Sequence, residues 1–379
     1  MNKTYLIRLC VAVVALLFAL QAYADTFQVG KLYYKVNDDG VSVTITYCDN
    51  GSGDFVIPPE VSYEDKTYTV TNIGSRAFSY KKYTSITIPN TVTTLQKEAF
   101  YKCYSSSVVI PNSVTSIGAQ AFQESYLTSI VIPESATELG QGIVYQCESL
   151  KSVDLQCKPT AIPRIMFGRC EALESVTLPP TVTEIGESAF AECSALKNVD
   201  MPNVETIGED AFYECRALER LYLPNTVKTI QNSAFRTCSS LAFISFGNSV
   251  ELVGTNAFIE IPALLEVNCK ATTPPTLTRD VFSDYDRSKA KMLVPVGCVQ
   301  AYKNSSWGIY FDFIDELPMQ STDVNRDGTT DIEDLNTVLN VLLKRGTVPT
   351  EQRDNSDINN DDKVDVIDLN LIINFMLEL

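Results

Sequence analysis

A repeat of 22 to 24 residues constrains this chain more than any other feature of its sequence. A fixed period of this length is typical of solenoids, in which each unit buries its apolar residues only by stacking on its neighbours. The repeat is marked by a column of aromatic residues, hereafter the phenylalanine column: Phe78, Phe100, Phe122, Phe167, Phe190, Phe212, Phe235, Phe258 and Phe282, with Val144 in the remaining place. The column predicts about ten repeats.

One unit, residues 173–193, shows what each repeat contains. Val176-Thr177-Leu178 alternates apolar and polar side chains like a short strand with one buried face, and Pro179 ends it because proline cannot extend a hydrogen-bond ladder. Ala189-Phe190 and Cys193 have the spacing of a single helical turn. We therefore predict a solenoid of short β-strands and helical or 3-10 turns, an α/β repeat, with strands stacked roughly 4.8 Å apart.

The first 24 residues have the pattern of a secretion signal. Lys3 and Arg8 charge the start, an apolar run from Leu9 to Leu20 follows, and Ala22-Tyr23-Ala24 is a small-x-small cleavage site. We predict that residues 1–24 are a signal peptide and that the protein is secreted or held at the cell surface, with the periplasm as an alternative. No later segment reaches the roughly 18 apolar residues of a membrane helix, so we expect no transmembrane segment.

Charge and composition exclude two broad classes of function. The net charge of −17 over 379 residues argues against a nucleic-acid partner, because phosphate binding needs a concentrated basic surface. The chain has no histidine, the commonest acid-base residue and the usual base of serine and cysteine triads. We therefore predict no enzymatic activity.

Six cysteines recur three residues after the phenylalanine column, as one inward position of the repeat: Cys103, Cys147, Cys170, Cys193, Cys215 and Cys238. Free cysteine packs as a small hydrophobe, so we interpret this column as buried thiols. Disulfides between adjacent turns are the alternative, since stacking would bring the Cα atoms within reach of one another. A zinc or redox site is disfavoured because the chain lacks histidine and any Cys-x-x-Cys pair.

The residue type varies from repeat to repeat at the outward position of each predicted strand. These residues should line one exposed face of a sheet, where variation could encode a partner. The alternative is a merely solvated face. The candidate partner-binding positions are Thr87, Val109, Val131, Asp154, Thr177, Asp200, Tyr222 and Ser245.

The repeated pattern I-P-x-[ST]-V-x-x-I-G-x-x-A-F-x-x-C resembles the BspA-like leucine-rich repeat of bacterial surface proteins, over approximately residues 55–290. The resemblance implies a BspA-like leucine-rich repeat solenoid over 71–290, an N-terminal β cap over 25–70 and a C-terminal cap over 291–318. Caps cover core and strand edges that an open solenoid end would expose. The resemblance also implies adhesion, the binding of host matrix components or other bacteria.

Residues 319–379 are acidic, with 13 Asp and Glu against 5 Lys and Arg, and the acid is patterned. Two segments place oxygen ligands at loop positions 1, 3, 5, 9 and 12, with a backbone carbonyl at 7, as calcium loops do. We predict two calcium ions. The candidate ligands are Asp323, Asn325, Asp327, Thr329, Asp331 and Asp334 in the first loop, and Asp357, Asn359, Asp361, Lys363, Asp365 and Asp368 in the second. Asp362 stands where the first loop has glycine.

Apolar residues recur at helical spacing after each loop, from Leu335 to Leu342 and from Leu369 to Met376. Two loop–helix units resemble the type I dockerin over 323–379. The resemblance implies a small all-α calcium-binding dockerin-like domain over 319–379 and a cohesin-like protein partner. Its contact positions correspond to Ile332, Glu333, Val366 and Ile367. The alternative is that calcium merely folds a terminal cap.

Three functions remain open. The first is an exported, non-catalytic binding or adhesion protein whose solenoid face binds a macromolecule and whose calcium module docks to a cohesin-like partner. The second is a glycan-binding accessory subunit of a polysaccharide-degrading assembly. The third is a structural spacer with a calcium-stabilised cap. Glycan readers commonly expose aromatic platforms, and the predicted face offers only Tyr222, which favours a protein ligand.

Overall fold

The computed structural model describes residues 26–318, 324, 330, 332–343 and 356–378. The predicted signal peptide lies outside the described residues, as do five candidate ligands of the first calcium loop: Asp323, Asn325, Asp327, Thr329 and Asp331. The protein is a β-solenoid of about 12 turns, which confirms the predicted fold class. Its chain divides into two compact units, Met1–Pro159 with Pro163–Pro179, and Thr160–Ile162 with Pro180–Leu379.

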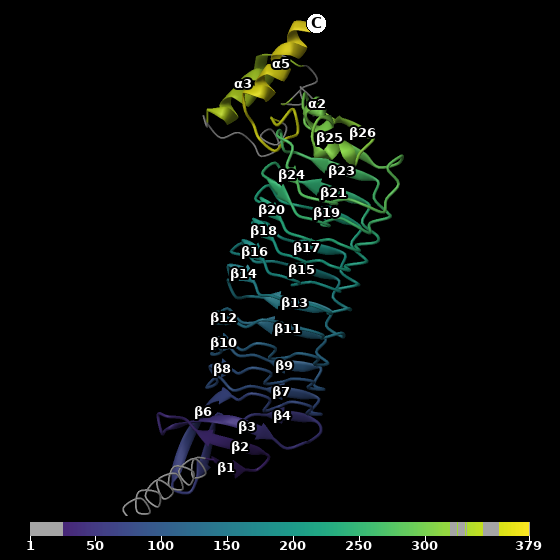
Figure 1. Ribbon diagram of the computed structural model, residues 1–379. Coiled ribbons are helices and arrows are strands. Elements are labelled where there is room, and N and C mark those ends of the chain that lie inside the picture. Colours follow the sequence, from purple (N-terminus) through teal and green to yellow (C-terminus); the bar gives the residue numbers. More distant parts are fainter. Residues whose placement is uncertain (1–25, 319–323, 325–329, 331, 344–355, 379) are drawn as a thin grey trace, which may run out of the picture. The chain divides into compact units, whose positions relative to one another are not determined.

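The first unit begins with a sheet that leads directly into the repeats (Figure 1). Strands β1 (Thr26–Val29), β2 (Leu32–Val36) and β3 (Ser42–Cys48) pair antiparallel in that order, and β5 (Glu60–Tyr63) pairs antiparallel with β6 (Lys66–Ile73). β3 lies parallel to β6, and the ladder continues in parallel through β8 (Thr94–Leu95), β10 (Ser116–Ile117) and β12 (Glu138–Leu139). The antiparallel sheet thus covers the edge of the first repeat.

A second row of longer strands runs through the same unit. It contains β4 (Asp54–Val56), β7 (Ser85–Thr87), β9 (Ser107–Val109), β11 (Ser129–Ile132), β13 (Ser152–Leu155) and β15 (Ser175–Thr177). β4, β7 and β9 form one parallel ladder, and β11 and β13 form another. Within each of these strands apolar side chains point inward and alternate with outward ones, as the Val-Thr-Leu pattern predicts.

The second unit has the same two rows. The two-residue strands β14 (Ala161–Ile162), β16 (Glu184–Ile185), β18 (Thr206–Ile207), β20 (Thr229–Ile230), β22 (Leu252–Val253) and β24 (Thr276–Leu277) form one parallel ladder. The other row contains β17 (Asn198–Asp200), β19 (Arg220–Tyr222), β21 (Phe243–Phe246), β23 (Glu266–Cys269), β25 (Lys291–Val294) and β26 (Phe313–Glu316). Strands β19 to β26 of this row pair in parallel, so the closing segment extends the ladder.

Short helices complete the closing segment. α2 (Val299–Lys303) and the 3-10 helix η1 (Ser306–Ile309) lie between β25 and β26. η1 contributes Trp307, which is fully buried and donates its indole N–H to the carbonyl of Pro275 at 2.9 Å. The hydroxyl of Tyr302 donates to the carbonyl of Ala271 at 2.6 Å. The large aromatic residues of this segment therefore fill the core at the end of the ladder, with their polar atoms bonded.

The phenylalanine column forms the core of both units. In the first unit, Phe100 stacks on Phe78 with ring centroids 5.3 Å apart and on Phe122 at 4.9 Å. In the second unit, Phe212 stacks on Phe190 at 5.2 Å and on Phe235 at 5.0 Å. The rings are nearly parallel and buried, so the interpretation of this column as stacked core is confirmed.

The segment around each column residue bonds within its own repeat at 3-10 spacing. In the repeat of Phe100, the N–H groups of Ala99, Tyr101 and Cys103 each donate to the carbonyl three residues earlier, at 3.2, 2.9 and 3.0 Å. These bonds do not form a continuous helix, because every second N–H bonds to the next repeat and not within its own. The segment is a series of tight turns.

The intervening N–H groups bond to the next repeat. Glu98, Phe100 and Lys102 donate to carbonyls of the following turn at 3.0, 2.7 and 2.8 Å. This alternation requires left-handed backbone two residues before and two after the column, with φ of 57° at Glu98 and 50° at Lys102. Positive φ recurs at these two positions along the solenoid, as at Arg76, Tyr80, Gln120, Glu124, Ser188, Glu192, Asp210 and Glu214.

The cysteine column is a row of free thiols. The Sγ–H of Cys147 donates to the carbonyl of Phe122 at 3.0 Å, and that of Cys238 to Phe212 at 3.3 Å. Ser125 occupies the same column, and its hydroxyl donates to the equivalent carbonyl, that of Phe100, at 2.7 Å. All ten cysteines among the described residues are unbridged, which agrees with buried thiols rather than disulfides. Burial raises the pKa of Cys147 and of Cys238 to about 12.

Two longer helices follow the solenoid, α3 (Ile332–Leu342) and α5 (Val366–Glu378). They pack through a small apolar core of Val324, Val338, Ile358 and Ile372. Each helix therefore contributes the apolar residues that the sequence places at helical spacing. None of the helices in the described part of the chain is long and apolar enough to cross a membrane.

Candidate functional site

The second predicted calcium loop, residues 357–368, is folded around its own carboxylates. Asp357, at the first loop position, accepts the N–H of Asp361 at 3.0 Å through Oδ1 and the N–H of Asp362 at 2.7 Å through Oδ2. Asp368, at the last position, accepts the N–H groups of Ile358 and Asn359 at 2.7 and 3.1 Å. The loop thus brings its first and last acidic ligands toward the same stretch of backbone.

These carboxylates are buried and mutually repulsive. The pKa of Asp357 is raised to about 6, chiefly by burial; the loop's N–H bonds oppose this shift, and the nearby charges of Asp361 and Asp368 contribute to it. Burial also raises the pKa of Asp361 and of Asp368. Asp361 Oδ2 is buried without a hydrogen-bond partner. A divalent cation would supply both the missing charge and the missing partner, so these residues fit calcium.

The remaining positions of the loop also suit calcium. Asn359 is buried beside Asp361 and offers an amide oxygen, while Lys363 stands at the position that uses its backbone carbonyl. Among the described residues, no three Asp, Glu or Cys side chains are grouped so as to hold an ion by themselves. Amide, carbonyl and water oxygens therefore have to complete any site.

Asp362 and Asp365 support the turn of the loop. Asp362 has φ of 63°, the left-handed conformation that glycine takes freely and that aspartate tolerates. The substitution of the expected glycine therefore leaves the backbone path intact. Asp365 Oδ1 accepts the N–H of Ile367 at 2.7 Å, which caps the start of α5.

Of the candidate ligands of the first loop, Asp334 is the one that lies among the described residues. This carboxylate is fully buried in the first turn of α3, as Asp368 is in the first turn of α5. The two residues hold the same loop position in their respective units. The other candidate ligands of the first loop remain predictions.

The predicted partner-contact residues of the calcium module lie at the starts of its two helices. Ile332, Val366 and Ile367 are 45 to 63% exposed, and Glu333 is exposed beside Ile332. Ile332 opens α3 and Val366 opens α5. Exposed apolar side chains at equivalent places in two units are typical of a protein-binding surface.

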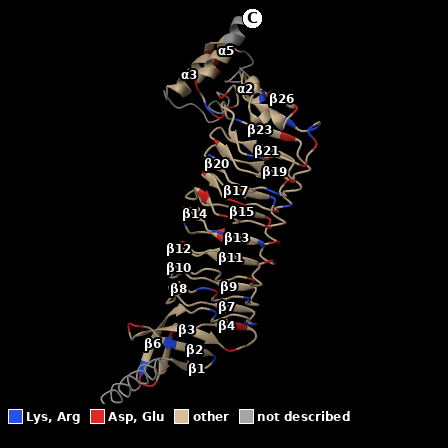
Figure 2. Cartoon of the chain, viewed as in Figure 1, with Lys and Arg blue, Asp and Glu red and all other residues tan. Residues whose placement is uncertain are grey.

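The predicted face of the solenoid is exposed, with one partial exception. Thr87, Val109, Val131, Asp154, Thr177, Asp200 and Tyr222 are exposed, whereas Ser245 is half-buried. The Tyr222 hydroxyl accepts the Nε–H of Arg220 at 2.8 Å. Lys and Arg residues are interspersed with Asp and Glu along the described solenoid (Figure 2). Partner binding by this face stays a prediction.

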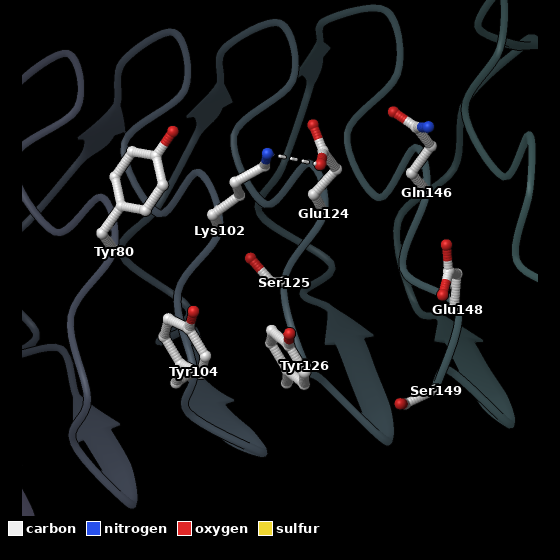
Figure 3. Close-up of a pocket in the computed structure, with 9 residues that line it drawn as sticks. All are labelled: Tyr80, Lys102, Tyr104, Glu124, Ser125, Tyr126, Gln146, Glu148 and Ser149. Atoms are coloured by element: carbon white, nitrogen blue, oxygen red, sulfur yellow. Dashed lines mark ion pairs between the residues drawn. The ribbon is translucent and has the colours of Figure 1, made fainter.

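Sequence reasoning missed a second surface, in the first unit. Two columns, two and four residues after the phenylalanine column, enclose a hollow of about 320 Å³ (Figure 3). We call it the tyrosine hollow; its lining is Tyr80, Lys102, Tyr104, Glu124, Ser125, Tyr126, Gln146, Glu148 and Ser149. The recurrence of tyrosine at 104 and 126, each four residues after the column, was the signal that could have revealed it.

Side chains in and beside the tyrosine hollow hold one another in place through ring stacking, an ion pair and hydrogen bonds. The rings of Tyr104 and Tyr126 stack with centroids 4.7 Å apart and planes 13° apart. Lys102 Nζ lies 2.9 Å from Glu124, which also accepts the hydroxyl of Tyr101 at 2.9 Å. The pKa of Lys102 is raised, first by its hydrogen bond to Glu124. Tyr80, Tyr104 and Tyr126 nevertheless remain 53, 43 and 50% exposed.

Comparison with known families assigns both parts of the chain. The model of the BspA type leucine-rich repeat region matches residues 71–171 and 160–287, in 6 copies. The model of the dockerin type I domain matches residues 321–377. Type I dockerin domains bind calcium. No curated protein gave a match.

Three solved structures are similar to this chain. A leucine-rich repeat protein from Bacteroides ovatus is 26% identical, with a TM-score of 0.53, over 71% of this chain and 78% of that one. A leucine-rich repeat protein from Eubacterium ventriosum is 23% identical, with a TM-score of 0.40, over 76% of this chain and 91% of that one. The pneumococcal vaccine antigen PcpA is 19% identical, with a TM-score of 0.44, over 77% and 98%. The repeats, their stacked core and the family matches together show that this chain belongs to the BspA type leucine-rich repeat family and carries a C-terminal type I dockerin domain.

Proposed function

We propose that this protein is an exported, non-catalytic binding protein that presents a macromolecular ligand on its solenoid and is anchored to a cohesin-like partner by its calcium module. The observation that carries the proposal is the exposed apolar set of Ile332, Val366 and Ile367 at the start of the two dockerin helices. This surface belongs to a chain whose other described part is a repeat solenoid, an architecture that offers extended surface for macromolecules.

In this proposal, calcium binding folds the module that attaches the protein to its cohesin-like partner. We propose two ions, one in each loop, with Asp334 and Asp368 closing the two sites. Without a cation, the carboxylates of the second loop repel one another, and Asp361 Oδ2 has no partner. Calcium binds only the folded loop tightly, so it should stabilise both helices and the surface at their starts.

Export is the setting that the proposal requires. Residues 1–24 have a signal-peptide pattern, and extracellular calcium is abundant enough to fill loops of moderate affinity. The protein would then act outside the cytoplasm, secreted or at the cell surface. Its proposed role is adhesion-like binding rather than catalysis, because the chain contains no histidine and its buried thiols are held protonated.

The proposed anchor can be tested with the full-length protein and a set of immobilised type I cohesin domains. Binding should require calcium and should be lost with a chelator. The double variant Ile332→Asp, Val366→Asp should bind at least tenfold more weakly, because it places charge in an apolar interface. Leu343→Asp is the matched control, since Leu343 is 49% exposed just after α3 and away from the contact positions.

Two results would count against the proposed anchor. Calcium-dependent folding of the chain without binding to any cohesin would leave only a calcium-stabilised cap on a spacer. Equal loss of binding in the control and the double variant would mean that the starts of the helices are not the interface.

A further inference from the structure

We propose that the tyrosine hollow binds a neutral sugar ring of a polysaccharide, stacked on the free face of Tyr126. This inference rests on the proposed function, because it assigns the ligand class of the solenoid. It differs from the predicted binding face, which is formed by the outward residues of the longer strands.

The stack of rings ends at Tyr126. The column four residues after the phenylalanines reads Lys82, Tyr104, Tyr126 and Glu148 in successive repeats. Tyr104 has Tyr126 on one side and the Lys82 ammonium 5.4 Å from its ring centroid. Tyr126 has Tyr104 on one side, and the next repeat offers the flexible chain of Glu148 in place of a third ring (Figure 3). A flat ligand can therefore continue the stack.

The groups around this free face suit the rim of a sugar ring. A pyranose presents an apolar C–H face that packs on an aromatic ring, and hydroxyls at its edge that need hydrogen-bond partners. Glu148 and Ser149 are exposed in the next repeat and provide an acceptor and a hydroxyl. Gln146 uses its Oε1 to accept from Gln123 at 3.3 Å, which leaves its amide nitrogen as a donor.

Charge and size favour a neutral ligand. The one lysine that lines the hollow, Lys102, is already paired with Glu124 at 2.9 Å, and Glu148 would repel an anion. A phosphorylated or uronic-acid polymer is thereby disfavoured. The volume of about 320 Å³ is at the lower end of ligand sites, which are typically about 300 to 1,000 Å³, and suits one or two rings rather than a protein segment.

The experiment uses the full-length protein in native gels that contain soluble neutral polysaccharides: a mixed-linkage glucan, a galactomannan, an arabinoxylan and an inulin, each in a separate gel. Polygalacturonate serves as the anionic comparison. We expect at least one neutral polymer to retard the protein. Tyr126→Ala should weaken that retardation at least tenfold, whereas Tyr126→Phe should keep it, because the ring and not its hydroxyl carries the stacking.

Tyr47→Ala is the matched control, since Tyr47 in β3 is a similarly exposed tyrosine that lies outside the tyrosine hollow and outside the predicted binding face. It should leave retardation unchanged, and all variants should melt within a few degrees of the wild type. The inference is overturned if no neutral polymer retards the wild type, if Tyr126→Ala is retarded normally, or if polygalacturonate binds best. Loss of a protein ligand in Tyr126→Ala, without any polysaccharide binding, would also overturn it.

Cohesin binding is measured on the same protein samples, so the two proposals fail separately. Normal cohesin binding without polysaccharide retardation rejects the sugar site and leaves the proposed anchor standing. Polysaccharide retardation without cohesin binding rejects the anchor and supports the sugar site.

Discussion

The backbone N–H of Asp361 donates to Asp357 Oδ1 across 3.0 Å, so the second calcium loop closes on its own first ligand. The same contact brings two buried carboxylates together, and each has a raised pKa. Two carboxylates held this close favour a bound cation, which leads to the first prediction.

Replacing Asp357 and Asp368 by alanine should abolish the second calcium site and leave the first. Isothermal calorimetry on the full-length protein should count two ions in the wild type and one in the double variant. Helical circular dichroism should fall when calcium is removed, because α3 and α5 share a small core between the loops. Fewer than one ion per chain at millimolar calcium would refute the module.

Truncation of one column residue should destabilise the second unit strongly. Phe212 is buried between two parallel rings, so Phe212→Ala should lower the free energy of unfolding by about 3 to 5 kcal/mol. Phe212→Val should cost less, since Val144 fills the same column in another repeat. Urea unfolding measures both, with the exposed Tyr222→Ala as the reference. Equal costs for alanine and valine would contradict a stacked column.

The buried thiols should make stability fall at high pH. Cys238 has an ordinary pKa of 9.0 when unfolded and a pKa of about 12 when folded, because burial disfavours the thiolate. Both states are protonated below pH 9. Between pH 9 and 12 only the unfolded chain loses this proton, so stability falls with rising pH, by about 1.4 kcal/mol per pH unit for one thiol.

The variant Cys238→Ser tests whether this thiol causes the loss of stability with rising pH. The serine should retain the hydrogen bond to the Phe212 carbonyl, as Ser125 does with Phe100, but it removes the ionisation. Urea unfolding at pH 7.5 and pH 10, in reductant, should show a smaller loss of stability in the variant by about 1 kcal/mol. An unchanged difference between the two pH values would place this thiol in solvent.

At the positions with left-handed backbone, a β-branched residue should lower the stability of the protein more than an unbranched one. Glu214 has φ of 58° and is one of the recurrent positions two residues after the column. Glu214→Val should destabilise the protein by about 1 to 2 kcal/mol more than Glu214→Asn, because a β-branched residue is strained in this conformation. Denaturant midpoints of the two variants check it. Identical midpoints would mean that the backbone at this position relaxes.

The inward half of the repeat could be predicted from sequence because packing fixes both its residue types and its spacing. Phe190 and Cys193 are where the pattern places them, buried and in register. The helix-like spacing around Phe190 did not reveal its turns, because left-handed backbone falls on Ser188 and Glu192 without glycine to mark it. Hydrogen bonds to the next repeat impose that conformation, and a local pattern does not contain them.

The calcium loop could be predicted from the sequence, whereas the tyrosine hollow was missed. Asp357 and Asp368 follow a ligand spacing that needs no knowledge of the fold, so the loop could be read directly. The tyrosine hollow depends on Tyr104 and Tyr126 being adjacent across repeats and on Glu148 ending their stack. It lies on a turn, whereas the outward strand positions directed attention to Tyr222.

The hydrogen bonds between turns also determine how the second unit would respond to mechanical load. Its strands β14 to β24 bond only to their neighbours, along the direction of stacking. Tension in that direction would load these bonds in series, so turns would peel away singly. Each released turn of 22 to 24 residues would add roughly 75 Å of extended chain. The second unit would then lengthen in steps and dissipate a pull before its full force reached the proposed cohesin-like partner.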